Sequence, residues 1–178
     1  PLSLCLFQKA KWQCIFGILK RETNRRKFRE VLDVRGRKNG KSTEHAAVAN
    51  YLTLTEKGGE LYSAATVADQ ARRIWEESQS MIDQSKDLQS VLDYKVFPRP
   101  TIYKKRTAFK STYKVLSKNV RTFDGLNASG AIIDEIHELP RSIYDILKQS
   151  MSARSEPLLS MITTAGFVRA GLLDDEYE

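Results

Sequence analysis

Cysteine, histidine and long apolar runs are scarce in this sequence, and each scarcity excludes a class of protein. Its two cysteines, Cys5 and Cys14, cannot make a disulfide framework or, by themselves, a four-ligand zinc site. No apolar run approaches the roughly 18 residues that a membrane-spanning helix needs. The first residues lack the basic segment of a secretory signal. We therefore expect reduced thiols, a cytoplasmic location and no membrane association.

Positive charge, in contrast, is in excess. The 178 residues include 29 Lys and Arg against 22 Asp and Glu, which gives a net charge of +7. Such an excess favours a polyanionic partner, because Lys and Arg neutralise phosphates and release condensed counterions. An ordinary basic surface that serves solubility is the alternative. The basic residues cluster at 20–29 and at 99–118.

The hydrophobic pattern alternates between strands and helices over a length that suits one domain of about 150 residues. Apolar runs predict strands at 28–34, 60–64, 131–135 and 158–163, and helical spacing predicts helices at 11–20, 41–54, 67–82 and from 140 on. Thr66 is the expected N-cap of the third helix, and Pro140 is the expected first residue of the last. Segments 101–105 and 112–116 predict a β-hairpin insertion. The pattern indicates an α/β fold whose mainly parallel central sheet is flanked by helices.

The most specific motif is the segment 35–42, which has the sequence Arg-Gly-Arg-Lys-Asn-Gly-Lys-Ser between a predicted strand and a predicted helix. It matches the phosphate-loop pattern G-x-x-x-x-G-K-S/T except at its first position, where Arg35 replaces Gly. Backbone N–H groups of such a loop converge on phosphate oxygens, and the helix N-terminus adds about half a positive charge. Lys41 would contact the β- and γ-phosphates of ATP, and the Ser42 hydroxyl would bind Mg²⁺. The alternative is a solvated basic surface turn.

A second motif, Asp134-Glu135, closes a buried apolar strand, which is where open α/β sheets place their chemistry. Asp134 would bind Mg²⁺ through water, and Glu135 would orient and deprotonate the attacking water. One acidic pair alone is more typical of a turn. With a phosphate loop upstream, however, the pair predicts the core of an ATP hydrolase. His137 is a candidate sensor of hydrolysis, and His45 receives no role.

Five segments, 37–43, 62–66, 124–127, 133–137 and 162–166, occur in the order and spacing of a phage terminase large subunit. The sequence most resembles the branch found in tailed phages of the HK97 type, from about Leu6 to its end. The resemblance implies the ATPase half of a DNA-packaging motor. It also implies a P-loop NTPase fold of the additional-strand, catalytic-glutamate class, with the strand of Thr163 between the phosphate-loop strand and the strand of Asp134.

The resemblance also implies roles for individual residues. Arg37 matches the arginine that stabilises γ-phosphate charge in cis, so the expected catalytic residues are Glu135, Arg37 and Lys41. Gln8 matches a glutamine that contacts adenine. Thr163, Thr164 and Gly166 match the motif that couples the γ-phosphate to movement. The expected nucleotide-binding residues are Gln8, Arg35, Gly36, Arg37, Lys38, Asn39, Gly40, Lys41, Ser42 and Thr43, and the expected metal-binding residues are Ser42 and Asp134.

As partners, the resemblance implies double-stranded DNA, a portal protein, a terminase small subunit and further copies of the chain in a homo-oligomeric ring, in the cytoplasm of a phage's or prophage's host. The missing initiator Met and the acidic residues near the end predict a fragment. Relative to the family, residues 1–178 would form the ATPase domain without the lid and without the C-terminal nuclease domain, so this chain is not expected to cut DNA.

Two alternatives remain. Asp134-Glu135-Ile136-His137 fits the D-E-x-H pattern of helicase-like DNA-dependent translocases, although these need a second RecA-like domain and usually carry Ser-Ala-Thr where this chain has Thr-Thr-Ala-Gly. The other alternative is a non-catalytic basic DNA-binding module with a relic phosphate loop. The intact loop and acidic pair argue against a relic.

Overall fold

The strands and helices come from a computed structural model that describes residues 3–106, 108–116, 125–164 and 175. The helices are α1 (Leu6–Gly17), α2 (Lys41–Thr55), α3 (Ala68–Asp83), α4 (Lys86–Val91), the 3-10 turn η2 (Ile136–Glu138) and α5 (Arg141–Ser150). The strands are β1 (Glu30–Val34), β2 (Glu60–Ala64), β3 (Leu92–Lys95), β4 (Thr101–Lys104), β5 (Thr112–Val115), β6 (Ala128–Asp134) and β7 (Leu158–Thr163).

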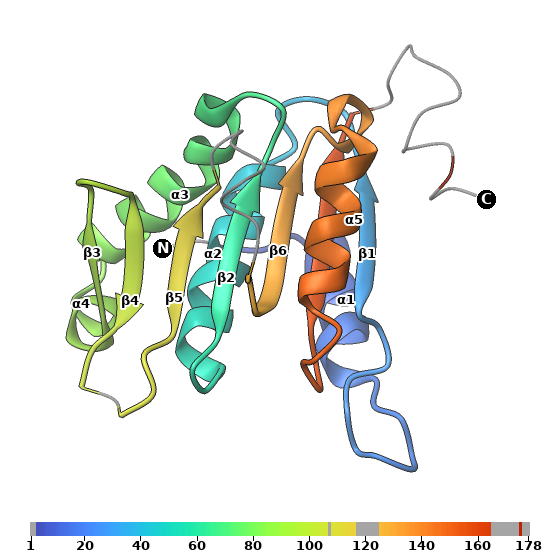
Figure 1. The fold of residues 1–178 in the computed structure, drawn as a ribbon, viewed down its shortest axis with the longest axis horizontal. Helices are drawn as coiled ribbons and strands as arrows, with labels where there is room; N and C mark the ends of the chain where they lie inside the picture. Colours follow the sequence, from blue (N-terminus) through green and yellow to red (C-terminus); the bar gives the residue numbers. More distant parts are fainter. Residues whose placement is uncertain (1–2, 107, 117–124, 165–174, 176–178) are drawn as a thin grey trace.

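The described strands form one seven-stranded sheet in the order β1-β7-β6-β2-β5-β4-β3 (Figure 1). Strands β1, β7, β6, β2 and β5 pair in parallel, whereas β4 pairs antiparallel with both β5 and β3. The expected position of β7 between the phosphate-loop strand β1 and the Asp134 strand β6 is confirmed. The predicted mainly parallel α/β sheet is confirmed as well.

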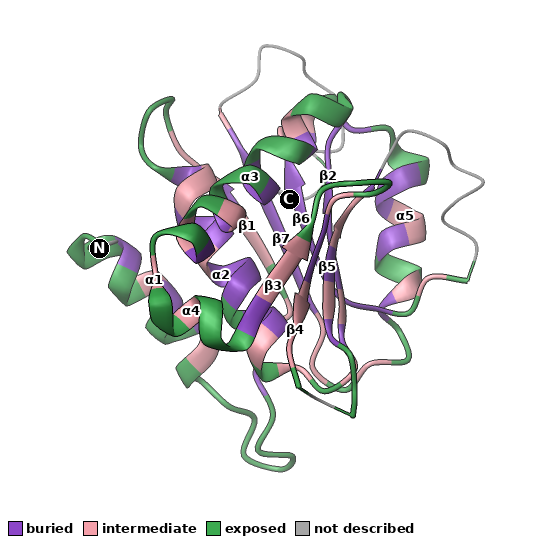
Figure 2. Cartoon of the chain, turned by 90° about the vertical axis from the view of Figure 1, so that its left-hand side faces the viewer, coloured by how far each residue is buried: buried purple, intermediate pink, exposed green. Residues whose placement is uncertain are grey.

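Helices cover both faces of the sheet, as Figure 2 shows from the side. Helix α5 packs on one face, in a core that includes Leu147 and Met161. Helices α1, α2 and α3 pack on the other face, in a core that includes Trp75 and Ile162. Neighbouring residues of β7 therefore point into different cores, as the two-residue period of a strand requires. Burial on both faces explains why β6 and β7 are buried at every position.

Several predicted boundaries differ from the structure. Helix α1 begins at Leu6, earlier than expected, and Pro140 is the N-cap of α5 rather than its first residue. Val67, not Thr66, is the N-cap of α3, and the Thr66 hydroxyl donates to the Glu138 carbonyl (2.6 Å).

Three elements, α4, β3 and the short 3-10 turn η2, were not predicted. Helix α4 is short and has no buried residue among those described, so it carries no apolar stripe. Strand β3 extends the predicted β4–β5 hairpin by one antiparallel partner.

The register of the parallel strands places three segments at one edge of the sheet. Val34, the last residue of β1, lies opposite Thr163, the last residue of β7. Asp134, the last residue of β6, lies opposite Ile162. Neighbouring strands are about 4.8 Å apart. The loop after β1 and the acids at the end of β6 are therefore separated by only two strand spacings. In the described part of the chain, no helix is long and apolar enough to cross a membrane.

Candidate functional site

The phosphate loop joins β1 to α2 across the carboxyl edge of the sheet. The Arg35 N–H donates to the Thr163 carbonyl (3.1 Å), which fixes the beginning of the loop to the end of β7. Lys38 and Gly40 adopt positive φ angles of 62° and 68°, and Gly40 is the N-cap of α2. A left-handed conformation at Gly40 suits glycine because it has no Cβ. Residues 36–40 are exposed, so ligand can reach the N-terminus of α2.

Lys41 points back into this loop. Its side chain is largely buried, and its Nζ donates to the carbonyls of Arg35 (2.7 Å) and Gly36 (3.1 Å). Two backbone carbonyl oxygens of the loop thus accept hydrogen bonds from the ammonium. Ser42 follows directly and lines a cavity of about 310 Å³ together with Arg73, Glu76, Glu77 and Ser80 of α3.

Asp134 is the buried last residue of β6, and its Oδ1 accepts the Glu135 N–H (3.1 Å). Burial raises the pKa of Asp134 from 3.8 to about 6, and the negative charge of Glu135 adds to the effect. The positive charges of Lys41 and Arg73 oppose it. Asp134 therefore lies within electrostatic reach of the phosphate-loop lysine, and a divalent cation would stabilise its ionised form. The carboxylate of Asp134 and the hydroxyl of Ser42 are both oxygen donors, which is the kind of ligand that Mg²⁺ prefers.

Glu135 has a left-handed backbone, with φ 50° and ψ 58°. Such a conformation costs energy in a residue other than glycine and often occurs at functional sites. Its Oε2 accepts hydrogen bonds from the Thr163 hydroxyl and from the Thr164 N–H, both 3.2 Å. Nδ1 of His137 lies 2.6 Å from the Thr163 hydroxyl and 3.4 Å from Glu135 Oε2. Glu135, the candidate base, thus contacts Thr163 and Thr164, two of the three residues expected to couple the γ-phosphate to movement.

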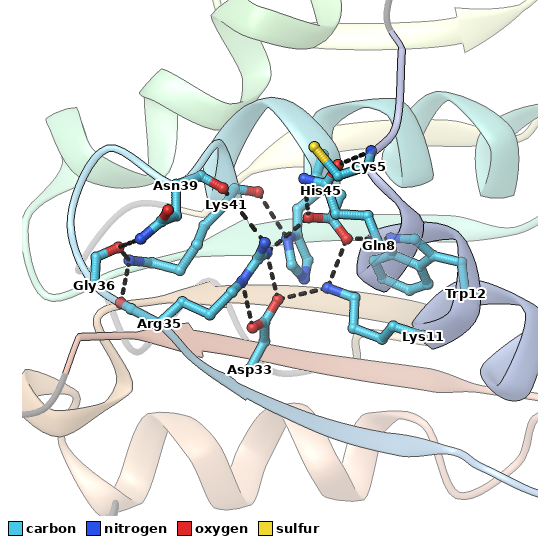
Figure 3. A network of polar contacts seen from close by, with 11 residues as sticks. Cys5, Gln8, Lys11, Trp12, Asp33, Arg35, Gly36, Asn39, Lys41 and His45 are labelled. Atoms are coloured by element: carbon cyan, nitrogen blue, oxygen red, sulfur yellow. Dashed lines mark hydrogen bonds and ion pairs between the residues drawn. The ribbon is translucent and has the colours of Figure 1, made fainter.

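A charged network lies beneath the loop, between β1, α1 and α2 (Figure 3). Arg35 donates through Nε and Nη2 to both carboxylate oxygens of Asp33 (2.7 and 2.6 Å), and through Nη2 to Glu44 (2.7 Å). Lys11 of α1 contacts the same two carboxylates, at 2.5 Å and 2.6 Å. Burial alone would raise the pKa of Asp33 and of Glu44, but the hydrogen bonds from Arg35 and Lys11 outweigh it and lower both. Both acids therefore stay ionised at neutral pH.

Gln8 uses both ends of its amide within the protein. Its Nε2 donates to Glu44 (2.9 Å), and its Oε1 accepts the Cys5 N–H (2.8 Å). Gln8 lies next to the loop, because a Cβ placed on Gly40 would be 3.8 Å from its Nε2. An adenine contact would have to replace these two hydrogen bonds, so that role stays a prediction.

The other predicted residues lie where the loop opens to solvent. Arg37 and Lys38 are exposed at its tip. The Asn39 side chain donates to the Gly36 carbonyl (3.2 Å), and the Thr43 hydroxyl lies 3.5 Å from Glu77. Gly166 lies outside the described residues.

Sequence reasoning did not find Asp33, Glu44 or Arg73. The available signal was an acid at a buried position of a strand and another on the buried face of α2. Among the described residues, no three His, Cys, Asp or Glu side chains gather as a metal-binding cluster. Both cysteines are free and exposed.

Comparison with known proteins gives one consistent family. The family described as terminase large subunit, ATPase domain, matches residues 6–178. The terminase large subunit of Lactococcus phage p2 is 29% identical over 142 residues, which are 78% of this chain and 26% of that protein. This chain therefore spans about a quarter of that relative's length.

Solved structures agree in fold. The large terminase of bacteriophage HK97 superposes with a TM-score of 0.83 at 22% identity, covering 98% of this chain and 36% of that one. The large terminase of a thermophilic bacteriophage, solved in complex with ATP-gamma-S, superposes with a TM-score of 0.58 at 14% identity, covering 76% of this chain and 32% of that one. The predicted P-loop NTPase fold is thereby confirmed.

Proposed function

The chain belongs to the family of terminase large subunit ATPase domains, and from this membership we propose that it hydrolyses ATP to drive double-stranded DNA into a phage procapsid. Residues 1–178 would form the ATPase domain of that motor and would not cut DNA. The observation that carries it is the common edge of β1, β7 and β6, where the phosphate loop, Thr163 and the Asp134-Glu135 pair lie side by side.

The binding of nucleotide would use the loop and the N-terminus of α2. The backbone N–H groups and Lys41 would contact phosphate oxygens, and Lys41 would leave the carbonyls that it now contacts. Arg37, exposed at the loop's tip, would approach the γ-phosphate. Ser42 and Asp134 would hold Mg²⁺, which supplies charge stabilisation for phosphoryl transfer when bound. In support, Asp134 is buried without a cationic hydrogen-bond partner among the described residues.

Glu135 would orient the attacking water and accept its proton. The carboxylate is held by Thr163 and Thr164, so its position depends on the end of β7. The same strand end accepts the Arg35 N–H, which begins the phosphate loop. We therefore propose that β7 couples the state of the nucleotide to movement, as expected for Thr163, Thr164 and Gly166, and that His137 contacts this link through Thr163.

DNA would be held through its phosphates, because a packaging motor must accept any sequence. In the cluster at 99–118, Lys104 and Lys105 donate to backbone carbonyls within the protein (2.6 and 2.7 Å), so they are less available than their sequence suggests. Arg99, Arg106 and Lys110 are exposed. We propose these three as DNA contacts. We also propose that the chain assembles in the host cytoplasm with a portal protein and a terminase small subunit, and that further copies of it form a ring.

The test replaces Glu135 by Gln, which keeps the size of the side chain and removes the base. Binding of ATP should change by less than about threefold, whereas Mg²⁺-dependent turnover should fall by about 10²-fold or more. The matched control is Glu22→Gln, which makes the same change at an exposed carboxylate outside the site and should leave turnover within about twofold. Turnover of Glu135→Gln at the original rate would remove Glu135 from the role of base.

Stimulation of the wild-type rate by duplex DNA tests the motor itself. A rate that rises with duplex DNA of any sequence is expected. Unwinding of duplex DNA by the protein would favour a helicase-like translocase instead.

A further inference from the structure

Arg35 occupies the first position of the phosphate loop, and its guanidinium is engaged by hydrogen-bond acceptors of the protein. Besides its bonds to Asp33 and Glu44, Nη1 donates to the carbonyl of Asn39 (3.3 Å). Asn39 lies near the far end of the loop and contacts Gly36 through its own side chain (3.2 Å). One guanidinium therefore joins the beginning of the loop, its end and the first turn of α2.

Glu44 connects this arrangement to the first helix. Its side chain is 1% exposed, and it accepts hydrogen bonds from residues of α1 as well as from Arg35. The donors of α1 are Gln8, Lys11 and Trp12. Glu44 also lies in the first turn of α2, where a negative charge is stabilised by the helix dipole. Asp33 shares the partners Lys11 and Arg35 but lies on β1, so Glu44 is the carboxylate that joins α1 and the loop to α2.

Charge balance makes the cluster of Lys11, Asp33, Arg35 and Glu44 interdependent. Two cations face two anions, and the carboxylates are 5% and 1% exposed. Removal of one partner leaves a charge buried without compensation, which costs far more than the pair gains. The position of Arg35 is therefore set by Asp33 and Glu44, and Arg35 in turn sets the carbonyl of Asn39.

We propose that Asp33 and Glu44 position the phosphate loop through Arg35, so that Arg35 shapes the loop and does not contact the nucleotide. The role of the loop as a nucleotide site rests on the proposed function. Arg37, at the exposed tip, is then the loop arginine that faces the nucleotide. Helix α1 is held to the loop by the same carboxylate, Glu44.

The first experiment uses the nucleotide-free protein. Trypsin can cut after Arg37 and Lys38, and the rate of cutting follows the population of the opened loop. Arg35→Met and Glu44→Gln should each speed this cutting by about tenfold. Arg35→Lys keeps the charge, so it should be cut more slowly than Arg35→Met. The control is Arg72→Met, which removes an exposed arginine paired with Glu76 and should change the rate by less than about twofold. Equal rates in wild type and Arg35→Met would overturn the proposal.

The second experiment separates shaping from direct contact. If Arg35 shapes the loop, Arg35→Met should weaken the binding of ATP and the binding of ADP by the same factor, about tenfold. It should leave kcat within about twofold. If Arg35 contacts the γ-phosphate, Arg35→Met would weaken the binding of ATP more than the binding of ADP, and kcat would fall. That result would refute the proposal. Circular dichroism should confirm that each variant is folded, and Arg35→Lys repeats the comparison with a smaller change.

The two experiments also distinguish this inference from the proposed function. Faster cutting in the variants of a protein that binds no nucleotide would reject the ATPase proposal and support the positioning of the loop. If the protein binds nucleotide but the variants are cut at the wild-type rate, the positioning of the loop by Arg35 is rejected and the ATPase proposal is supported.

Discussion

The buried imidazole of His45 gives a prediction that can be worked from the structure. His45 is 0% exposed, its Nδ1 lies 2.8 Å from the Lys41 carbonyl, and its ring packs edge-on against Trp12 at 5.3 Å. If Nδ1–H donates to that carbonyl, the proton gained on protonation goes to Nε2, which has no hydrogen-bond partner within the described residues. Burial lowers the pKa of His45 from 6.5 to about 4, although the Lys41 carbonyl opposes the change.

The lowered pKa of His45 determines whether stability rises or falls with pH. The unfolded chain binds a proton at His45 below about pH 6.5, and the folded chain does so only below about pH 4. The contribution of His45 to stability is therefore complete above pH 6.5 and is lost as the pH falls toward 4. At about 1.36 kcal/mol for each pKa unit, the full loss is about 3 kcal/mol, and the loss between pH 8 and pH 5 is about 2 kcal/mol. That amount corresponds to about 4–8 °C in Tm for a chain of this size.

The variant His45→Asn keeps a side-chain donor for the Lys41 carbonyl and cannot titrate. Its stability at pH 8 should fall because the smaller side chain leaves a gap beside Trp12, but its loss between pH 8 and pH 5 should be about 2 kcal/mol smaller than in wild type. Urea unfolding at both pH values measures this. Other titrating groups, Asp134 included, act in both proteins and cancel in the comparison.

The sequence has only one other histidine, His137, so His137→Asn is a matched control that should keep the wild-type dependence of His45. Nuclear magnetic resonance of the imidazole ring provides a direct measurement, with an expected midpoint near 4 for His45. A midpoint near 6.5, or an equal loss of stability in His45→Asn and wild type, would refute the reasoning.

Three further substitutions have outcomes that follow from the site and the sheet. Lys41→Ala should weaken ATP binding by about 10²-fold in a calorimetric titration, since the loop loses its point charge; unchanged affinity would contradict the phosphate-loop assignment. Thr163→Val removes a hydroxyl bond to the proposed catalytic carboxylate and should slow turnover by about tenfold without lowering Tm by more than about 4 °C. Gly130→Ala places a Cβ 2.8 Å from Leu61 and 3.0 Å from the Leu158 carbonyl, so it should destabilise the protein by about 1–3 kcal/mol in urea unfolding, and a neutral result would contradict that packing.

The fold was predictable where local pattern and burial agree. The apolar runs of β6 and β7 lie in strands buried on both faces, and the stripe of α3, with Ala71, Ile74 and Trp75, is buried as expected. The position of β7 between β1 and β6 came from the family resemblance, since hydrophobic pattern does not encode the order of parallel strands. Helix α4 and β3 were missed because a short exposed helix and an edge strand carry little periodic signal.

The candidate site divides in a similar way. The phosphate loop and the Asp134-Glu135 pair follow from motif and context, and their proximity follows once the strands are ordered. The partners of the predicted residues did not follow. Gln8 and Glu44 are 36 positions apart, and Thr163 and Glu135 are 28 apart, yet each pair is hydrogen-bonded.

By itself the sequence determined the types of element, the loop that can bind phosphate and the acids that can activate water, because these depend on neighbouring residues. Only the tertiary structure decided that Arg35 contacts Asp33, Glu44 and the far end of its own loop. The physical reason is that a buried charge must find its partner in space, and the packing of α1 and α2 against the sheet fixes which side chains come within hydrogen-bond distance.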